Sequence, residues 1–151
     1  MKKIVFTVLL SALFTGCASV KMEDKTASDR AKEFSTPSAG NAGLYIYRNH
    51  GLGTALKKDI RVDGKCIGES APGVFFVTEV SGDNTHEVTT ESEFSPNKLT
   101  MMFNVGKNYF IRQYIKFGVF VGGADLELVA EQEGKEDIVK LALASNGVCG
   151  E

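Results

Sequence analysis

Histidines and a glycine-rich motif are the first places to look for catalytic or metal chemistry. His50 and His86 are the only histidines, and neither lies beside a cysteine, a second histidine or a recognisable nucleophile motif. Gly51-Leu52-Gly53-Thr54 lacks the Gly-Lys-Ser/Thr ending that a phosphate-binding loop requires. We therefore expect no catalytic residues, no metal site and no cofactor, and we interpret residues 51–54 as a hairpin loop.

Three glutamates are the remaining candidates for acid–base chemistry. Glu87, Glu91 and Glu93 occupy alternate positions of a predicted strand and would share one face of a sheet. Two carboxylates at a suitable separation can hydrolyse glycosidic bonds. A solvent-facing strand of an antiparallel sheet carries Glu and Thr for solubility alone, however, and this interpretation is favoured. The protein is not expected to be an enzyme.

The first cysteine follows an apparent export segment. Two lysines and an apolar run at residues 4–14 precede Thr15, Gly16 and Cys17. The run is shorter than the roughly 20 residues that cross a membrane, so the pattern predicts a cleaved signal peptide over residues 1–16.

The segment Phe14-Thr15-Gly16-Cys17 resembles the lipobox of bacterial lipoproteins, with Phe14 where Leu is commonest. The resemblance implies that Cys17 becomes the mature N-terminus and carries acyl chains on its thiol and amine. More than one acyl chain gives stable attachment to a membrane. Ala18 stands where Asp would retain the protein at the inner membrane, which implies the periplasmic face of the outer membrane.

The other two cysteines form an even pair in an oxidising compartment. Cys66 and Cys149 have no neighbouring Cys or His, so a zinc site is not expected. A disulfide between them is favoured, and two separate buried thiols are the alternative.

Tyr and Arg side chains are best suited to recognition of a protein or glycan partner, because they dominate binding hot spots. The candidates are Tyr45, Tyr47, Arg48, Arg112 and Tyr114. The two tyrosines of the first strand can share a face with Arg112 and Tyr114 only if both strands belong to one sheet. Packing on the outer face of the sheet is the alternative role.

The segment Phe117-Gly118-Val119-Phe120-Val121-Gly122-Gly123 is apolar but too rich in glycine for a regular strand. It is either a buried strand with a bulge or an exposed apolar loop that touches a partner or the membrane.

The mature chain is expected to be acidic overall and to consist of a charged N-terminal segment followed by one domain. Removing residues 1–16 takes away two of the 17 basic residues and none of the 19 acidic ones, which leaves a net charge of −4. That sign disfavours nucleic acid as a partner. Residues 17–42 are charged and small, which predicts a lipidated N-terminus and flexible tether. Residues 43–151 suffice for one domain.

A period of two in the apolar residues begins after Gly43 and predicts seven or eight short strands. The clearest alternation is at Leu99, Met101, Phe103 and Val105. Asp63-Gly64 is a two-residue hairpin signal, whose register would pair Ile60 with Ile67 and Arg61 with Cys66.

The apolar period changes to that of a helix near the C-terminus. Ile138, Leu141, Ala142 and Ser145 follow a glutamate-rich start, and Asn146-Gly147 is a stop signal. The sequence therefore predicts a mainly β protein, an antiparallel β-sandwich closed by one C-terminal amphipathic helix.

Several motifs together resemble a bacterial lipoprotein family known only as a domain of unknown function. They are Leu44-Tyr45-Ile46-Tyr47-Arg48, Val62-Asp63-Gly64-Lys65, Tyr109-Phe110-Ile111-Arg112-Gln113 and Leu126-Glu127-Leu128-Val129. The hairpin is also similar to that of PEGA envelope domains, which are small β-sandwiches. The resemblance implies a fold and a cell-envelope setting and supplies no catalytic residues.

These features lead to an expectation of a membrane-anchored, non-enzymatic binding or structural module of the cell envelope. The alternative is an inhibitor or immunity-type lipoprotein that blocks a toxin or cell-wall hydrolase. A protruding charged loop would favour the inhibitor, and a concave Tyr/Arg face would favour ligand binding.

Overall fold

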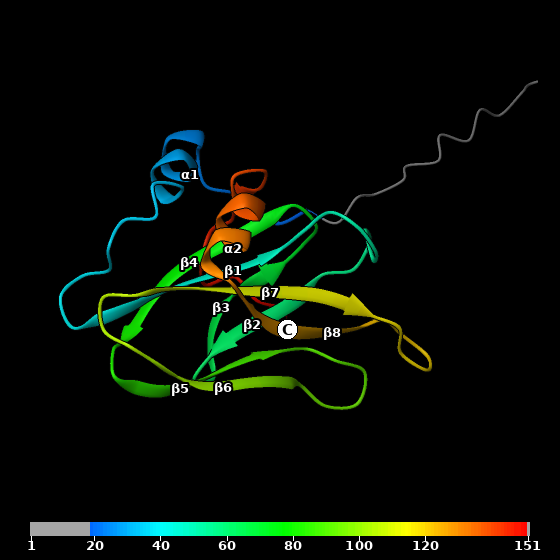
Figure 1. Ribbon diagram of the computed structural model, residues 1–151. Helices are drawn as coiled ribbons and strands as arrows, with labels where there is room; N and C mark the ends of the chain where they lie inside the picture. The colour runs from blue at the N-terminus through cyan, green and yellow to red at the C-terminus, as the bar shows by residue number, and fades with distance from the viewer. Residues whose placement is uncertain (1–18, 151) are drawn as a thin grey trace, which may run out of the picture.

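The computed structural model describes residues 19–150, which form two packed β-sheets and two short helices (Figure 1). One sheet has the strand order β8 (Gly123–Val129), β7 (Asn108–Lys116), β1 (Asn41–Arg48), β4 (Val74–Ser81) and β9 (Ala142–Leu143). The other has the order β3 (Lys65–Ser70), β2 (Lys58–Val62), β5 (Asn84–Thr90) and β6 (Asn97–Phe103). The helices are α1 (Lys25–Ala31) and α2 (Glu131–Ile138). The predicted signal peptide and Cys17 lie outside the described residues.

Strand β1 is buried on both faces, which explains its nearly unbroken apolar sequence. Leu44 and Ile46 point into the core between the two sheets. Tyr45 and Tyr47 point to the opposite face, where they form a second apolar cluster with Ile138 and residues from the helical segments. Figure 1 shows both helices on this outer side of the five-stranded sheet. The molecule therefore has three layers, with β1 in the middle one.

The predicted β-sandwich with a C-terminal helix is confirmed. Most of its strand pairs are antiparallel, as expected, but the five-stranded sheet is mixed because β1 pairs with β7, and β4 with β9, in parallel. Strands β1 and β7 belong to one sheet, as a shared face for Tyr47 and Arg112 requires, and these two residues are direct partners across the strands.

The Asp63-Gly64 hairpin is confirmed, with both turn residues at positive φ (50° and 76°). Its register agrees with expectation for Arg61 and Cys66 but not for Ile60, which lies opposite Gly68. A bulge between Ile60 and Arg61 shifts the pairing by one residue, and a bulge of this kind leaves no simple trace in the apolar pattern.

The predicted C-terminal helix is shorter than its apolar spacing indicated. It ends at Ile138, and Ala142–Leu143 instead forms β9 on the free edge of β4. Ile138 and Leu141 still bury their side chains against the outer cluster, as a longer helix would have done. The prediction was wrong beyond Ile138 because the backbone amides and carbonyls of residues 142–144 form hydrogen bonds with the edge of β4 instead of with another helical turn.

The prediction of a flexible tether over residues 17–42 is wrong for residues 19–42, which are folded onto the domain. Asp24 caps α1 by accepting a hydrogen bond from the Ala27 amide at 2.8 Å. Met22 forms an antiparallel bridge with Ala144, and Phe34 packs on Tyr45 with ring centroids 5.3 Å apart. Isolated apolar residues in a charged segment looked too few to fold, but each one meets a site on the β domain.

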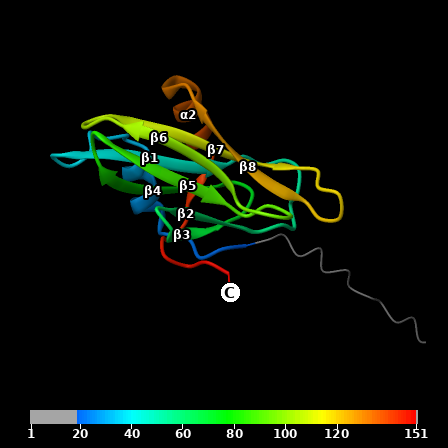
Figure 2. The ribbon, with the colours of Figure 1, turned by 90° about the horizontal axis from the view of Figure 1, so that it is seen from below.

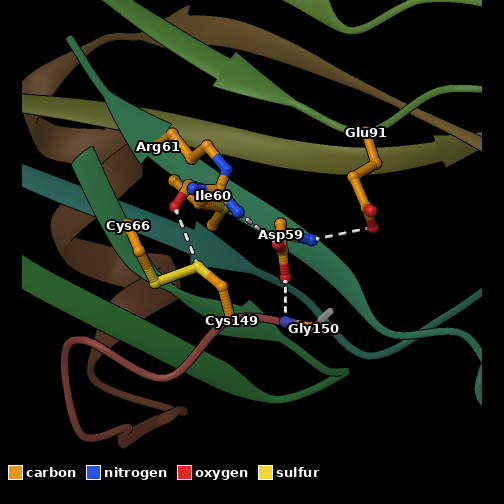
Figure 3. Close-up of a disulfide and its surroundings, with 7 residues drawn as sticks. All are labelled: Asp59, Ile60, Arg61, Cys66, Glu91, Cys149 and Gly150. Atoms are coloured by element: carbon orange, nitrogen blue, oxygen red, sulfur yellow. Dashed lines mark hydrogen bonds and ion pairs between the residues drawn. A yellow bond between two sulfur atoms is a disulfide. The ribbon is translucent and has the colours of Figure 1, made fainter. Parts of the chain in front are cut away.

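The predicted disulfide is confirmed and joins Cys66 of β3 to Cys149, 83 residues later. Figure 3 shows the bridge beside β2, where the Gly150 amide donates a hydrogen bond to Asp59 at 2.9 Å. Backbone bonds from Gly147 to Ile67 and from Glu69 to Val148, both 2.7 Å, fix the same segment. The bridge thus fastens the chain's last described residues to the hairpin.

Candidate functional site

The two tyrosines proposed for recognition are buried and contribute to packing. Tyr45 is 4% exposed and stacks on Phe110, while Tyr47 is fully buried beneath α2. The Tyr47 hydroxyl donates a hydrogen bond to Asp137 of α2 at 2.9 Å. Burial, followed by this bond, raises the pKa of Tyr47. The recognition role predicted for these residues is contradicted because α1, α2 and Phe34 cover the face on which they lie.

Arg112 lies at the rim of the same cluster and is engaged by acidic side chains. Its guanidinium donates hydrogen bonds to Glu127 and Glu133, each at 2.7 Å, and lies 3.5 Å from Asp137. These bonds, with that to Glu127 first, raise the pKa of Arg112. Of the five predicted recognition residues, Tyr114 alone is substantially exposed, at 40%. The five therefore do not form one open binding face.

Arg48, the fifth of these residues, is buried and organises a loop. It points between the sheets at the end of β1, where it donates hydrogen bonds to the carbonyl oxygens of Gly53 and Leu56 at 2.5 Å and 2.8 Å. Residues 49–57, which join β1 to β2, are thereby folded over the end of the sandwich. Arg48 therefore fixes the position of the 49–57 loop and of the side chains that this loop exposes.

Exposed apolar side chains gather at this end of the sandwich, on the three loops that follow β1, β5 and β7. We call this surface the apolar loop end, and it comprises Leu52, Phe94, Phe117, Val119, Phe120 and Val121. Each of these residues is between 56% and 89% exposed. The loop at residues 117–122 protrudes beyond the strands at the right of Figure 1. Of the two interpretations of the Phe117–Gly123 sequence, the exposed loop is the observed one.

Glu93 holds the protruding loop from the neighbouring 91–96 loop. Its carboxylate accepts hydrogen bonds from the amides of Val119 (2.6 Å), Phe120 and Val121 (3.2 Å). Desolvation by itself would raise the pKa of Glu93, but the three amides lower it below its ordinary value. A Cβ on Gly118 would lie 1.8 Å from the Val121 carbonyl oxygen and 2.3 Å from Glu93, so glycine is required there. The loop therefore has a defined shape despite its exposure.

A shallow apolar cavity of about 290 Å³ lies between the 49–57 and 117–122 loops. Leu52, Leu56, Ile115, Phe117 and Phe120 line it. A second hollow on the other side of Phe117 reaches Phe94 and Glu93. The loops thus present apolar ridges around two hollows, and Glu93 and Lys116 in the second hollow are bound to the loop amides and to Asp125.

The three glutamates considered for hydrolysis serve separate structural purposes. Glu87 pairs with Lys98 at 3.0 Å, Glu91 accepts the Asp59 amide at 3.1 Å, and Glu93 binds the loop. Within residues 19–150, no three His, Cys, Asp or Glu side chains converge as a metal site would need. In the same part of the chain, no helix combines the length and apolar character needed to cross a membrane.

His86 joins β5 to the Asp63-Gly64 hairpin. One ring nitrogen lies 2.6 Å from Asp63 and the other 2.9 Å from the Ser81 carbonyl oxygen, so both face acceptors. Desolvation lowers the pKa of His86, but the bonds to Asp63 and Ser81 outweigh it and raise the pKa overall. The bonds to the Glu87 amide and His86 lower the pKa of Asp63.

These shifts predict a loss of stability at alkaline pH. A raised histidine pKa adds stability that is complete below the unfolded value of about 6.5 and disappears as pH rises through the folded value. The free energy of unfolding should therefore fall from about pH 6 to about pH 9, by about 1 kcal/mol or less for such a surface pair. Urea denaturation at both pH values, with His86→Asn as control, checks this. An equal fall in the variant would show that another group is responsible.

The sequence pointed to the 117–123 segment but not to the residues that complete the apolar loop end. Leu52 lies in a glycine-rich loop, and Phe94 is a lone aromatic residue between polar residues and Pro96. A single exposed apolar residue is common on protein surfaces, so neither residue was a signal before the fold brought the three loops together. The bonds from Glu93 join segments 26 to 28 residues apart, and no local pattern indicates them.

Comparison with known proteins gives a family without an assigned activity. Residues 38–124 match the family described as protein of unknown function (DUF2846). An uncharacterized protein of Haemophilus influenzae is 53% identical over 135 residues, which cover 89% of this chain and 80% of that one. No solved structure matches. The match begins before β1 and ends within β8, so it includes the four-stranded sheet, strands β1, β4 and β7 of the other sheet and the protruding loop, while α2 and β9 lie beyond it. The chain belongs to the DUF2846 family.

Proposed function

We propose that the protein is a lipid-anchored module of the cell envelope, attached through Cys17 to the periplasmic face of the outer membrane, and that it acts by binding rather than catalysis. The observation that carries the binding role is the apolar loop end, whose exposed side chains are held in a fixed arrangement by Glu93 and Arg48. Exposed apolar surface of this kind is costly for solubility and marks interaction sites in other proteins.

The polar residues that could have supported an enzyme are used within the fold. Tyr47 and Arg112 bind α2, His86 binds Asp63, and Glu93 binds the protruding loop. Each of these side chains therefore has a structural partner within the domain. This arrangement supports a structural or binding role for the domain.

The inhibitor alternative receives less support from the loop. A blocking loop directed at a hydrolase was expected to carry charge at its tip, whereas Phe117, Val119 and Phe120 form this tip. Nor is there an open concave Tyr/Arg face of the kind expected for glycan binding, because the helices cover it. A flat or apolar partner surface suits the observed geometry better.

The experiment that tests the anchor is the replacement Cys17→Ser in the full-length precursor, made in a bacterium with lipoprotein-processing enzymes. We expect the wild-type protein to float with membranes in a density gradient and the variant to leave the membrane fraction or remain uncleaved, because the acceptor thiol is lost. Ser19→Ala, two residues along, is the matched control and should float like wild type. Membrane flotation equal to that of wild type, in Cys17→Ser protein that has lost its signal peptide, would contradict lipid attachment at Cys17.

A further inference from the structure

The described chain begins at the same end of the sandwich as the apolar loop end. Ser19 and Val20 line a hollow with Lys57 and Glu69, and Val20 packs against the inter-sheet core. Lys57 directly follows Leu56, which lines the cavity between the apolar loops. In Figure 2 the blue start of the described chain lies beside β3, and the protruding loop lies at the far end of β8.

The short distance from Cys17 to the folded domain limits where a lipid on Cys17 can reach. Cys17 is three residues before Val20, and a chain of three residues spans at most about 10 Å. The structure leaves no long tether, because residues 21–23 already pair with the C-terminal segment: the Glu23 amide donates to the Leu143 carbonyl oxygen, and the Ser145 amide to that of Lys21. A bilayer that holds acyl chains of Cys17 must therefore lie against this end of the domain.

We infer that the apolar loop end enters the lipid surface to which the protein is anchored, as a second membrane contact beside the lipid. This inference rests on the lipid anchor of the proposed function. The two contacts act together, because a lipid on Cys17, at most about 10 Å of chain from Val20, holds the domain at the bilayer and makes insertion of the loop effectively intramolecular. Phe117 and Phe120, the most exposed aromatic residues of the protruding loop, would enter deepest.

The backbone and flanking charges of the loop suit a lipid interface. Amides that enter an apolar region need partners, and Glu93 already accepts those of Val119, Phe120 and Val121. Lys116 precedes Phe117 at the base of the loop, where it pairs with Asp125 at 2.9 Å and stays 42% exposed, so its ammonium group can lie at headgroup level. The β6–β7 turn at the opposite end of the sandwich has a single exposed apolar residue, Val105, among Asn104, Gly106 and Lys107.

The absence of tryptophan from the chain allows a direct test with single-tryptophan variants. Phe120→Trp places the probe in the protruding loop, and Lys107→Trp places the matched control at the far end, where the side chain is also exposed. Phe117→Trp is a second probe in the same loop, to be used if tryptophan at position 120 disturbs the local fold. The full-length lipidated proteins are reconstituted into vesicles of phosphatidylethanolamine and phosphatidylglycerol, with or without brominated acyl chains.

The expected result is a shift of Phe120→Trp emission to shorter wavelength and about twofold or greater quenching by brominated lipid, since interfacial side chains reach about 5–10 Å into the boundary of the acyl region. Lys107→Trp should show neither change. Unquenched emission from both loop variants, in protein that floats with the vesicles, would overturn the inference and leave the anchor standing. A blue shift without quenching would indicate that protein covers the loop, which also overturns it. Failure of the proteins to float would refute the anchor, and the inference with it.

Discussion

Removal of the Cys66–Cys149 disulfide is expected to lower the free energy of unfolding by about 4.5 kcal/mol, the cost that chain entropy assigns to opening a loop of this length. The bridge closes 83 residues, which include most of the β domain and all of α2. The double variant Cys66→Ala/Cys149→Ala avoids a single unpaired thiol. Urea denaturation of the folded protein, with and without reductant, measures the effect.

Two comparisons make this result specific to the bridge. Reduction should destabilise the wild-type protein by the same amount and leave the double variant unchanged. A double variant within about 1 kcal/mol of wild type would show that the backbone bonds of Gly147 and Val148 to β3 hold the C-terminal segment without the disulfide.

Tyr47→Ala should destabilise the protein by about 3–5 kcal/mol, as truncation of a buried aromatic side chain does elsewhere. The variant leaves a cavity between β1 and α2 and removes the hydrogen bond to Asp137. Tyr114→Ala is the matched control, because this tyrosine is 40% exposed, and it should change stability by about 0.5 kcal/mol or less.

Thermal or urea denaturation of both tyrosine variants separates packing from recognition. Similar small effects for the two variants would mean that Tyr47 is not part of the core under α2. The recognition role first expected for Tyr47 would then have to be reconsidered.

The alternation of apolar residues predicted the strands well, because each strand carries its own period. It could not reveal that β1 is covered on both sides, since the cover comes from α1, α2 and Phe34, segments that are distant in sequence or poor in apolar residues. The local pattern alone therefore leaves Tyr45 and Tyr47 as candidates for an exposed face.

The C-terminal segment shows a second limit of local patterns. Ile138 and Leu141 have helical spacing, and both side chains are buried as predicted, yet the chain leaves the helix between them to pair with β4. An unpaired strand edge is a property of the assembled sheet, so no window of residues around position 140 contains it.

The candidate site was only half predictable for a related reason. An apolar, glycine-rich sequence at residues 117–123 is compatible with a buried bulge and with an exposed loop. The outcome depends on Glu93, which accepts three loop amides from 26 to 28 residues away, and on Arg48, which folds the neighbouring loop. Contacts between residues so far apart in sequence form only when the order of the strands in the sheets brings their loops together.

The intact mass of the protein purified from bacterial membranes with detergent shows whether a lipid on Cys17 holds this domain against a membrane. We expect a polypeptide that begins at Cys17 and is heavier than its amino-acid sequence by a thioether-linked diacylglyceryl group and an amide-linked acyl chain. A mature chain that begins at any other residue, or begins at an unmodified Cys17, would contradict it.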